Sequence, residues 1–68
     1  MQTPDLLTLR CVRSTAYNNE LAAELLRELA PFIESDELNR RLRCAARQLM
    51  RDADALEGAY QQMASSNQ

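Results

Sequence analysis

The chain has 68 residues and a net charge of −2, and all eight of its basic residues are arginine. It has one glycine, no histidine or tryptophan, no apolar run long enough to span a bilayer, and no basic-then-apolar start of the kind a secretion signal has. This composition excludes a membrane-spanning protein and predicts a small, soluble, cytoplasmic, all-α domain, whose single core supplies at most about 3–5 kcal/mol of net stability.

The first predicted helix covers about residues 4–30. Thr3 is placed to cap it, Pro4 suits its first position, and Asp5 favours the positive end of the helix dipole. Residues 14–20 (STAYNNE) have low helix propensity and could introduce a kink. The strongly helical ELAAELLREL that follows favours one continuous helix. Pro31 then lacks a backbone donor, which makes residues 31–35 a turn.

This first helix is apolar on two sides. One row contains Leu6, Leu9, Val12, Ala16, Ala23, Leu26 and Ile33, and a second, offset row contains Leu21, Leu25, Leu29 and Phe32. A helix that is apolar over so wide an arc needs more than one neighbour. The outward side, with Tyr17, Leu21, Leu25 and Phe32, is the predicted partner-binding surface. Taken one at a time, the two aromatic residues are interpreted first as core residues, with Tyr17 at the core edge and Phe32 as a plug at the turn.

The second predicted helix covers about residues 36–62, with Ser35 as its cap and a frayed tail at 64–68. Leu42, Leu49, Leu56 and Met63 recur every seven residues, which is the period of a coiled-coil seam. Small residues in the neighbouring row, Ala45 and Ala59, favour close approach of the helices. We predict an antiparallel helical hairpin of one domain (residues 1–68), in which Leu38, Leu42, Leu49, Leu56 and Met63 drive self-association into a homodimeric four-helix bundle. Capture by a larger protein is the alternative way to cover these apolar side chains.

Five arginines lie between residues 40 and 51. Antiparallel folding brings level those residues whose numbers sum to about 67, and this register pairs opposite charges at Glu24–Arg43, Glu20–Arg47, Arg13–Asp54 and Arg10–Glu57. Surface pairs of this kind are worth about 0–1 kcal/mol each, so they select orientation more than they stabilise. The arginine row is therefore interpreted as a solvated, partly paired face. The alternatives are docking of an acidic protein partner through Arg43 and Arg47, and nucleic-acid binding, which the acidic net charge disfavours.

No residue pattern in the chain indicates catalysis. There is no histidine, no glycine-rich phosphate loop and no metal-ligand cluster, so we expect no enzyme activity, no cofactor and no metal. Cys11 and Cys44 have no evident base beside them and are predicted to be reduced, half-buried thiols. An intermolecular disulfide is the alternative for these two residues.

Three function classes remain open. The favoured hypothesis is a small regulatory protein of bacterial or phage type that binds a larger protein and blocks or sequesters it, as an inhibitor or an anti-activator of transcription does. The segment ADALEGAYQQM (residues 53–63) resembles the C-terminal helix of the small type III secretion needle co-chaperones, and this resemblance implies a co-chaperone hairpin. In size and layout the predicted hairpin also resembles the plasmid protein Rop, which implies a dimer that binds RNA on one face.

Overall fold

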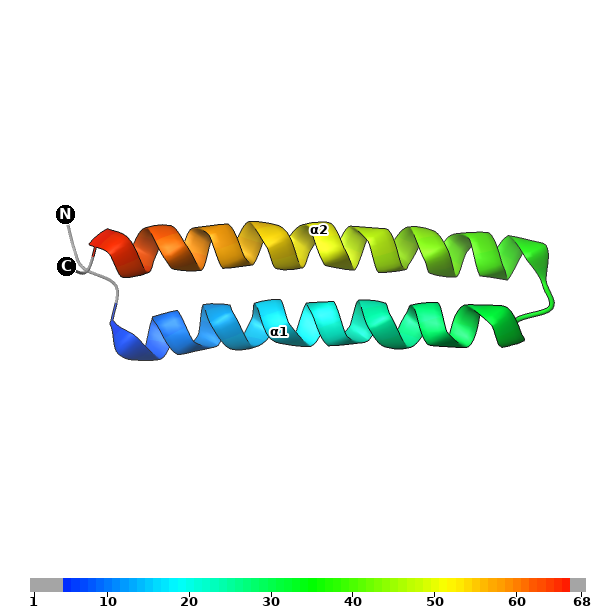
Figure 1. Cartoon of the computed structure of the whole chain (residues 1–68), viewed down its shortest axis with the longest axis horizontal. Coiled ribbons are helices and arrows are strands. Elements are labelled where there is room, and N and C mark those ends of the chain that lie inside the picture. Colours follow the sequence, from blue (N-terminus) through cyan, green and yellow to red (C-terminus); the bar gives the residue numbers. More distant parts are fainter. Residues whose placement is uncertain (1–4, 67–68) are drawn as a thin grey trace.

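The computed structural model describes residues 5–66 and consists of two long helices packed side by side as an antiparallel hairpin (Figure 1). Helix α1 spans Leu6–Leu29, the short 3-10 helix η1 spans Ala30–Phe32, and helix α2 spans Asp36–Ser66. No strand occurs within residues 5–66. The molecule is 51 Å long, and the start of α1 lies at the same end as the last turn of α2. The predicted all-α hairpin is confirmed.

Asp5 determines where α1 begins. Its Oδ1 atom accepts a hydrogen bond from the backbone amide of Thr8 at 2.7 Å, which satisfies one of the free amides of the first turn. The predicted cap, Thr3, and the predicted first helical residue, Pro4, lie outside the described residues, and the structure gives the capping role to Asp5. Further along, α1 continues without a break through residues 14–20, so the prediction of one continuous helix is confirmed.

The chain reverses direction between the two helices. Pro31 lies in the first turn of η1, where a missing amide leaves no hydrogen bond unmade. The amide of Ile33 donates to the carbonyl of Ala30 at 3.1 Å. Ser35 Oγ then accepts from a backbone amide in the first turn of α2 at 3.2 Å, which confirms the predicted cap. The side-chain amide of Asn39 donates to the carbonyl of Ala30 and so fastens the start of α2 to the end of α1.

Helix α2 is longer than the sequence predicted. It continues to Ser66, past the predicted end near residue 62, so residues 64–66 of the predicted frayed tail are helical and the rest of that tail lies outside the described residues. The residues after position 60 include glutamine, methionine and alanine, which are good helix formers and meet no proline.

Small side chains form the contact between the helices. The buried residues recur every seven positions and are Leu9, Ala16, Ala23 and Ala30 from the first half of the chain and Ala46 and Ala53 from α2. Alanines at this spacing allow two backbones to approach closely, and they leave the larger leucines beside the contact line instead of in it. The small residues predicted to make the contact, Ala45 and Ala59, are exposed. The contact therefore uses the next position along α2 at each repeat.

Two aromatic side chains lie outside the core positions that the sequence suggested for them. Tyr17 is 64% exposed and Phe32 is 81% exposed, and Leu6, from the first apolar row, is also 64% exposed. Phe32 points outward because η1 turns Ala30, two residues earlier, into the contact. Tyr17 follows the buried Ala16, and the step of about 100° between successive helical residues turns its side chain away from the contact. The core-edge interpretation of Tyr17 and the plug interpretation of Phe32 are therefore wrong.

The register of the hairpin differs from the predicted one by about two residues. Asn39 bonds to Ala30, and Ala16 and Ala53 line one hollow, so level residues have numbers that sum to 69. Within residues 5–66 none of the four predicted cross-helix ion pairs forms. The ion pair that does form there joins Arg40 to Glu37 at 3.0 Å, inside α2. Packing of the alanines decides the register because exposed ion pairs are worth little.

Candidate functional site

A row of large apolar side chains on α1 and η1 is exposed to solvent in the hairpin. We call this row the exposed stripe, and it consists of Tyr17, Leu21, Leu25, Leu29 and Phe32. Its first four members are spaced by four residues, which makes them neighbours on the helix surface. They are 41–64% exposed, and Phe32 is more exposed still. The structure thus places Tyr17, Leu21, Leu25 and Phe32 of the predicted partner-binding set in one continuous row.

The exposed stripe winds around α1 instead of running straight. Successive helical residues are about 100° apart, so Leu29 lies about 60° from the half-buried Leu26, whereas Leu21 lies about 140° from it. Tyr17 lies on the side opposite Leu26. The stripe therefore begins on the outer side of α1 and ends beside the residues that flank the alanine contact.

A second apolar row lies on α2. Leu42, Leu49, Leu56 and Met63, which we call the leucine seam, are all half-buried. They flank the alanine contact without being covered by it, as Val12 and Leu26 do on α1. Leu38, the remaining member of the predicted self-association set, is 54% exposed. The hairpin by itself thus leaves part of every seam side chain in contact with water.

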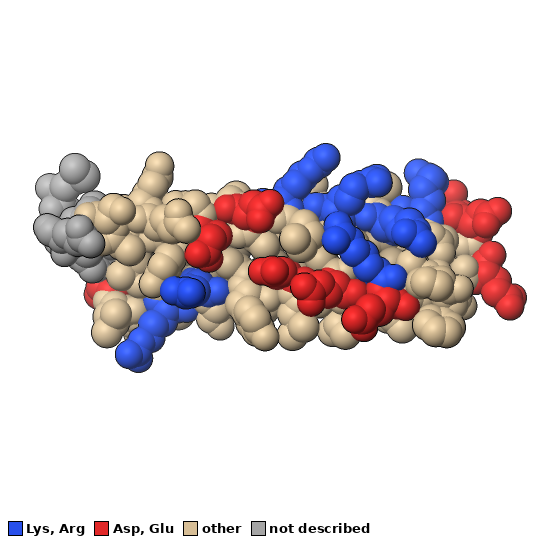
Figure 2. All heavy atoms as spheres, in the orientation of Figure 1, with Lys and Arg blue, Asp and Glu red and all other residues tan. Residues whose placement is uncertain are grey.

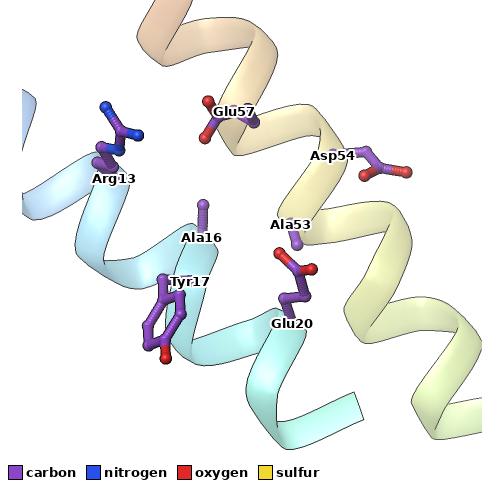
Figure 3. A pocket seen from close by; sticks show the side chains of 7 residues that line it. All are labelled: Arg13, Ala16, Tyr17, Glu20, Ala53, Asp54 and Glu57. Atoms are coloured by element: carbon purple, nitrogen blue, oxygen red, sulfur yellow. The ribbon is translucent and has the colours of Figure 1, made fainter. Parts of the chain in front are cut away.

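A hollow lies between the two helices on the side of Arg13. It has a volume of about 300 Å³, its floor is formed by Ala16 and Ala53, and its polar lining residues are Arg13, Tyr17, Glu20, Asp54 and Glu57 (Figure 3). Asp54 points away from α1 in this view, whereas Arg13 and Glu57 lie at the same end of the hollow.

Arg13 uses Tyr60 as its partner. Its guanidinium lies 5.2 Å from the centre of the Tyr60 ring, and Nη1 donates a long hydrogen bond of 3.5 Å to the phenol oxygen. The hydrogen bond to Tyr60 raises the pKa of Arg13 above its usual value, and Tyr60 and Glu57 also favour the charged form through electrostatic attraction. Arg13 thus contacts an aromatic side chain in place of the predicted Asp54, and a pattern of acidic and basic residues alone does not reveal such a contact.

Three arginines line a further hollow of about 290 Å³, nearer the turn. These are Arg27, Arg43 and Arg47, from both helices. Arg43 Nε donates to Asn39 Oδ1 at 2.7 Å and Arg47 donates to Cys44 Sγ at 3.2 Å, so each is held by its own helix. Figure 2 shows basic side chains gathered over the first half of α2, beside a row of acidic side chains over the second half of α1.

This arginine hollow is separate from much of the exposed stripe. Arg27 lies almost opposite both Leu25 and Leu29 on α1, since two residues along a helix correspond to a rotation of about 200°. The structure therefore divides the predicted partner-binding set, placing Arg43 and Arg47 beside Arg27 and leaving the apolar members on the other side of α1. The sequence did not single out Arg27, which joins the other two only when the hairpin forms.

The two cysteines carry no evident chemistry. Cys11 and Cys44 are both free, and both are exposed, so the prediction of half-buried side chains is wrong. Within residues 5–66 no group of histidine, cysteine or carboxylate side chains has the arrangement of a metal site.

A scan against protein-family models and searches of curated proteins and of solved structures found no match to this chain. In the part of the chain that the structure describes, neither helix combines the length and the apolar character needed to cross a bilayer. Residues 53–63, which resemble the needle co-chaperone helix, belong to α2. Ala53 within this segment is buried against α1, and Leu56 is half-buried.

Proposed function

We propose that this chain is a small, non-enzymatic, cytoplasmic protein that binds a larger protein through the exposed stripe and thereby blocks or sequesters it. The observation that carries the proposal is the exposure of five large apolar side chains in one row of neighbouring positions. Scattered exposed leucines are ordinary on protein surfaces, whereas a continuous apolar row of this length is typical of an interaction surface. An amphipathic partner helix is a suitable ligand, because it presents apolar residues at the same spacing.

Dimerisation belongs to the same proposal. The chain pairs with a second copy to form a four-helix bundle, because a hairpin whose contact line is made of alanines buries too little apolar surface to be stable alone. The dimer is the form that binds the larger protein.

The resemblances to the needle co-chaperones and to Rop predict different ligands. A needle co-chaperone would also bind an apolar protein segment, so the exposed stripe supports a co-chaperone as well as an inhibitor, and only the captured protein separates them. A Rop-like protein would instead bind RNA through basic residues such as Arg27, Arg43 and Arg47. The adjacent acidic row would repel an extended phosphate backbone, which favours protein as the ligand.

The proposal is tested by capture from a bacterial lysate with the tagged full chain, at low and at high salt. We expect one protein in fixed ratio to the bait, retained at high salt because apolar contacts are insensitive to screening. Leu25→Glu is expected to abolish capture without unfolding the hairpin, because Leu25 is 51% exposed. Gln62→Glu is the matched control, since it adds one negative charge at an exposed site on α2.

Two results would contradict the proposed function. One is capture that survives Leu25→Glu in a protein whose circular dichroism is unchanged. The other is recovery of nucleic acid that is released as salt rises and is lost when Arg43 and Arg47 are replaced by glutamine.

A further inference from the structure

We infer that the second copy of the chain covers the leucine seam, and that Tyr17 and Leu21 stay free on the outer side of α1 for the larger protein. This inference rests on the proposed pairing of two hairpins and assigns it to one face. It predicts a complex in which two chains present two partner sites.

The first argument is the surface area of the single hairpin. The chain exposes 5400 Å². A compact monomer of its mass, 7.7 kDa, is expected to expose about 4,300 Å². The difference is about 1,100 Å² per chain, or roughly 2,200 Å² for two chains, which is at the lower end of the range that obligate homodimers bury.

The second argument is the distribution of half-buried side chains. Leu42, Leu49, Leu56 and Met63 follow the hairpin over most of its length, and Val12 and Leu26 border the same side from α1. A face that extends along the whole molecule is best covered by an object of the same length, and a second hairpin has that length. The outer part of the exposed stripe occupies only the middle of α1.

The third argument is charge. In α1, Arg10 and Arg13 precede three glutamates, among which Arg27 is the exception. In α2 the arginines of residues 40–51 follow an acidic first turn and precede the carboxylates of residues 52–57. Where the helices of the two copies pack antiparallel, as in an up-down-up-down bundle, the basic part of one helix lies beside the acidic part of its neighbour. The net charge of −2 per chain is too small to oppose pairing strongly.

The test uses exposed alanines that border the seam. Ala45 lies three residues after Leu42, and Ala59 lies three residues after Leu56, so each neighbours the seam while being exposed in the hairpin. Gln61, which is about 200° around α2 from Ala59 and is also exposed, provides the control site. The variants are Ala45→Arg, Ala59→Arg and Gln61→Arg, and the readout is mass by sedimentation equilibrium with helix content by circular dichroism.

We expect the wild type and Gln61→Arg to have about twice the mass of one chain, and the two alanine variants to have the mass of one chain. A monomeric wild type at tens of micromolar would overturn the inference, and so would dimers that persist in both alanine variants. Partner capture is assayed separately on lysate. A wild type that dimerises but captures nothing therefore counts against the proposed function and not against the assigned face.

A second measurement tests the assigned face without disrupting the dimer, because an arginine variant that becomes monomeric could also unfold. Ala45→Cys and Gln61→Cys are made with Cys11 and Cys44 changed to serine, and the new thiol is alkylated with iodoacetamide. At a protein concentration where the dimer forms, we expect the thiol at position 45 to react at least fivefold more slowly than the thiol at position 61. Equal rates at the two positions would overturn the assigned face.

Discussion

Enlarging one alanine in the contact between the helices should destabilise the hairpin strongly. Ala23 and Ala46 are both fully buried, and the register places them level with one another. Ala46→Leu adds three carbon atoms where the two backbones approach closely. Such overpacking costs about 1–3 kcal/mol, because the helices must separate or the new side chain must adopt a strained rotamer. Alanine and leucine have similar helix propensity, so propensity accounts for little of this loss.

The control for this substitution is Ala55→Leu, at an exposed site on the same helix, where we expect a change within about 0.5 kcal/mol. In a domain of this size each kcal/mol shifts Tm by about 4–8 °C, so Ala46→Leu should lower Tm by about 4–24 °C. The assay is thermal unfolding by circular dichroism at one fixed protein concentration, since dimerisation makes Tm depend on concentration. If Ala46→Leu is as stable as the wild type, the helices do not approach closely at the alanines and the described contact is wrong.

Three further predictions concern single residues. Gly58→Ala should stabilise the protein by about 0.5–1 kcal/mol in urea unfolding, because a Cβ there meets nothing within 4 Å besides its chain neighbours and the backbone of its own helix, and because glycine weakens a helix interior. An unchanged midpoint would contradict this. The hydrogen bond from the Thr8 amide lowers the pKa of Asp5 below 3.8. The stabilisation by this cap is therefore present above pH 3.8 and is lost as the pH falls through the lowered pKa. The Asp5→Ala variant should accordingly show a smaller drop of Tm between pH 5 and pH 2 than the wild type does. Asn39→Ala should cost about 0.5–1.5 kcal/mol in the same urea assay, because the carbonyl of Ala30 loses its side-chain donor and keeps the amide of Ile33, and an unchanged urea midpoint would show that this hydrogen bond does not fasten the turn.

The exposed stripe was predictable in part from the sequence. The spacing of Leu21, Leu25 and Leu29 identified the row, since positions four apart are neighbours on any α-helix. Spacing also put Phe32 in this row but could not decide between the row and a plug at the turn, because the direction of Phe32 depends on how the 3-10 turn at Ala30–Phe32 rotates the chain. The same limit applies to Arg27, which meets Arg43 and Arg47 only across the two helices.

The sequence alone determined the local structure of this protein. Helix propensity and the cap at Ser35 are properties of a few neighbouring residues, and so is the break at Pro31; the two helices and their turn follow from them. The tertiary structure decided which rows face each other and in which register. Each helix has more than one apolar row that could face the other helix. The row of α2 that does so is the one with small side chains at Ala46 and Ala53, because these let the backbones come closest. The charge pattern favoured a register in which the numbers of level residues sum to about 67. The observed register differs from it by two residues, because exposed ion pairs contribute less free energy than close packing does.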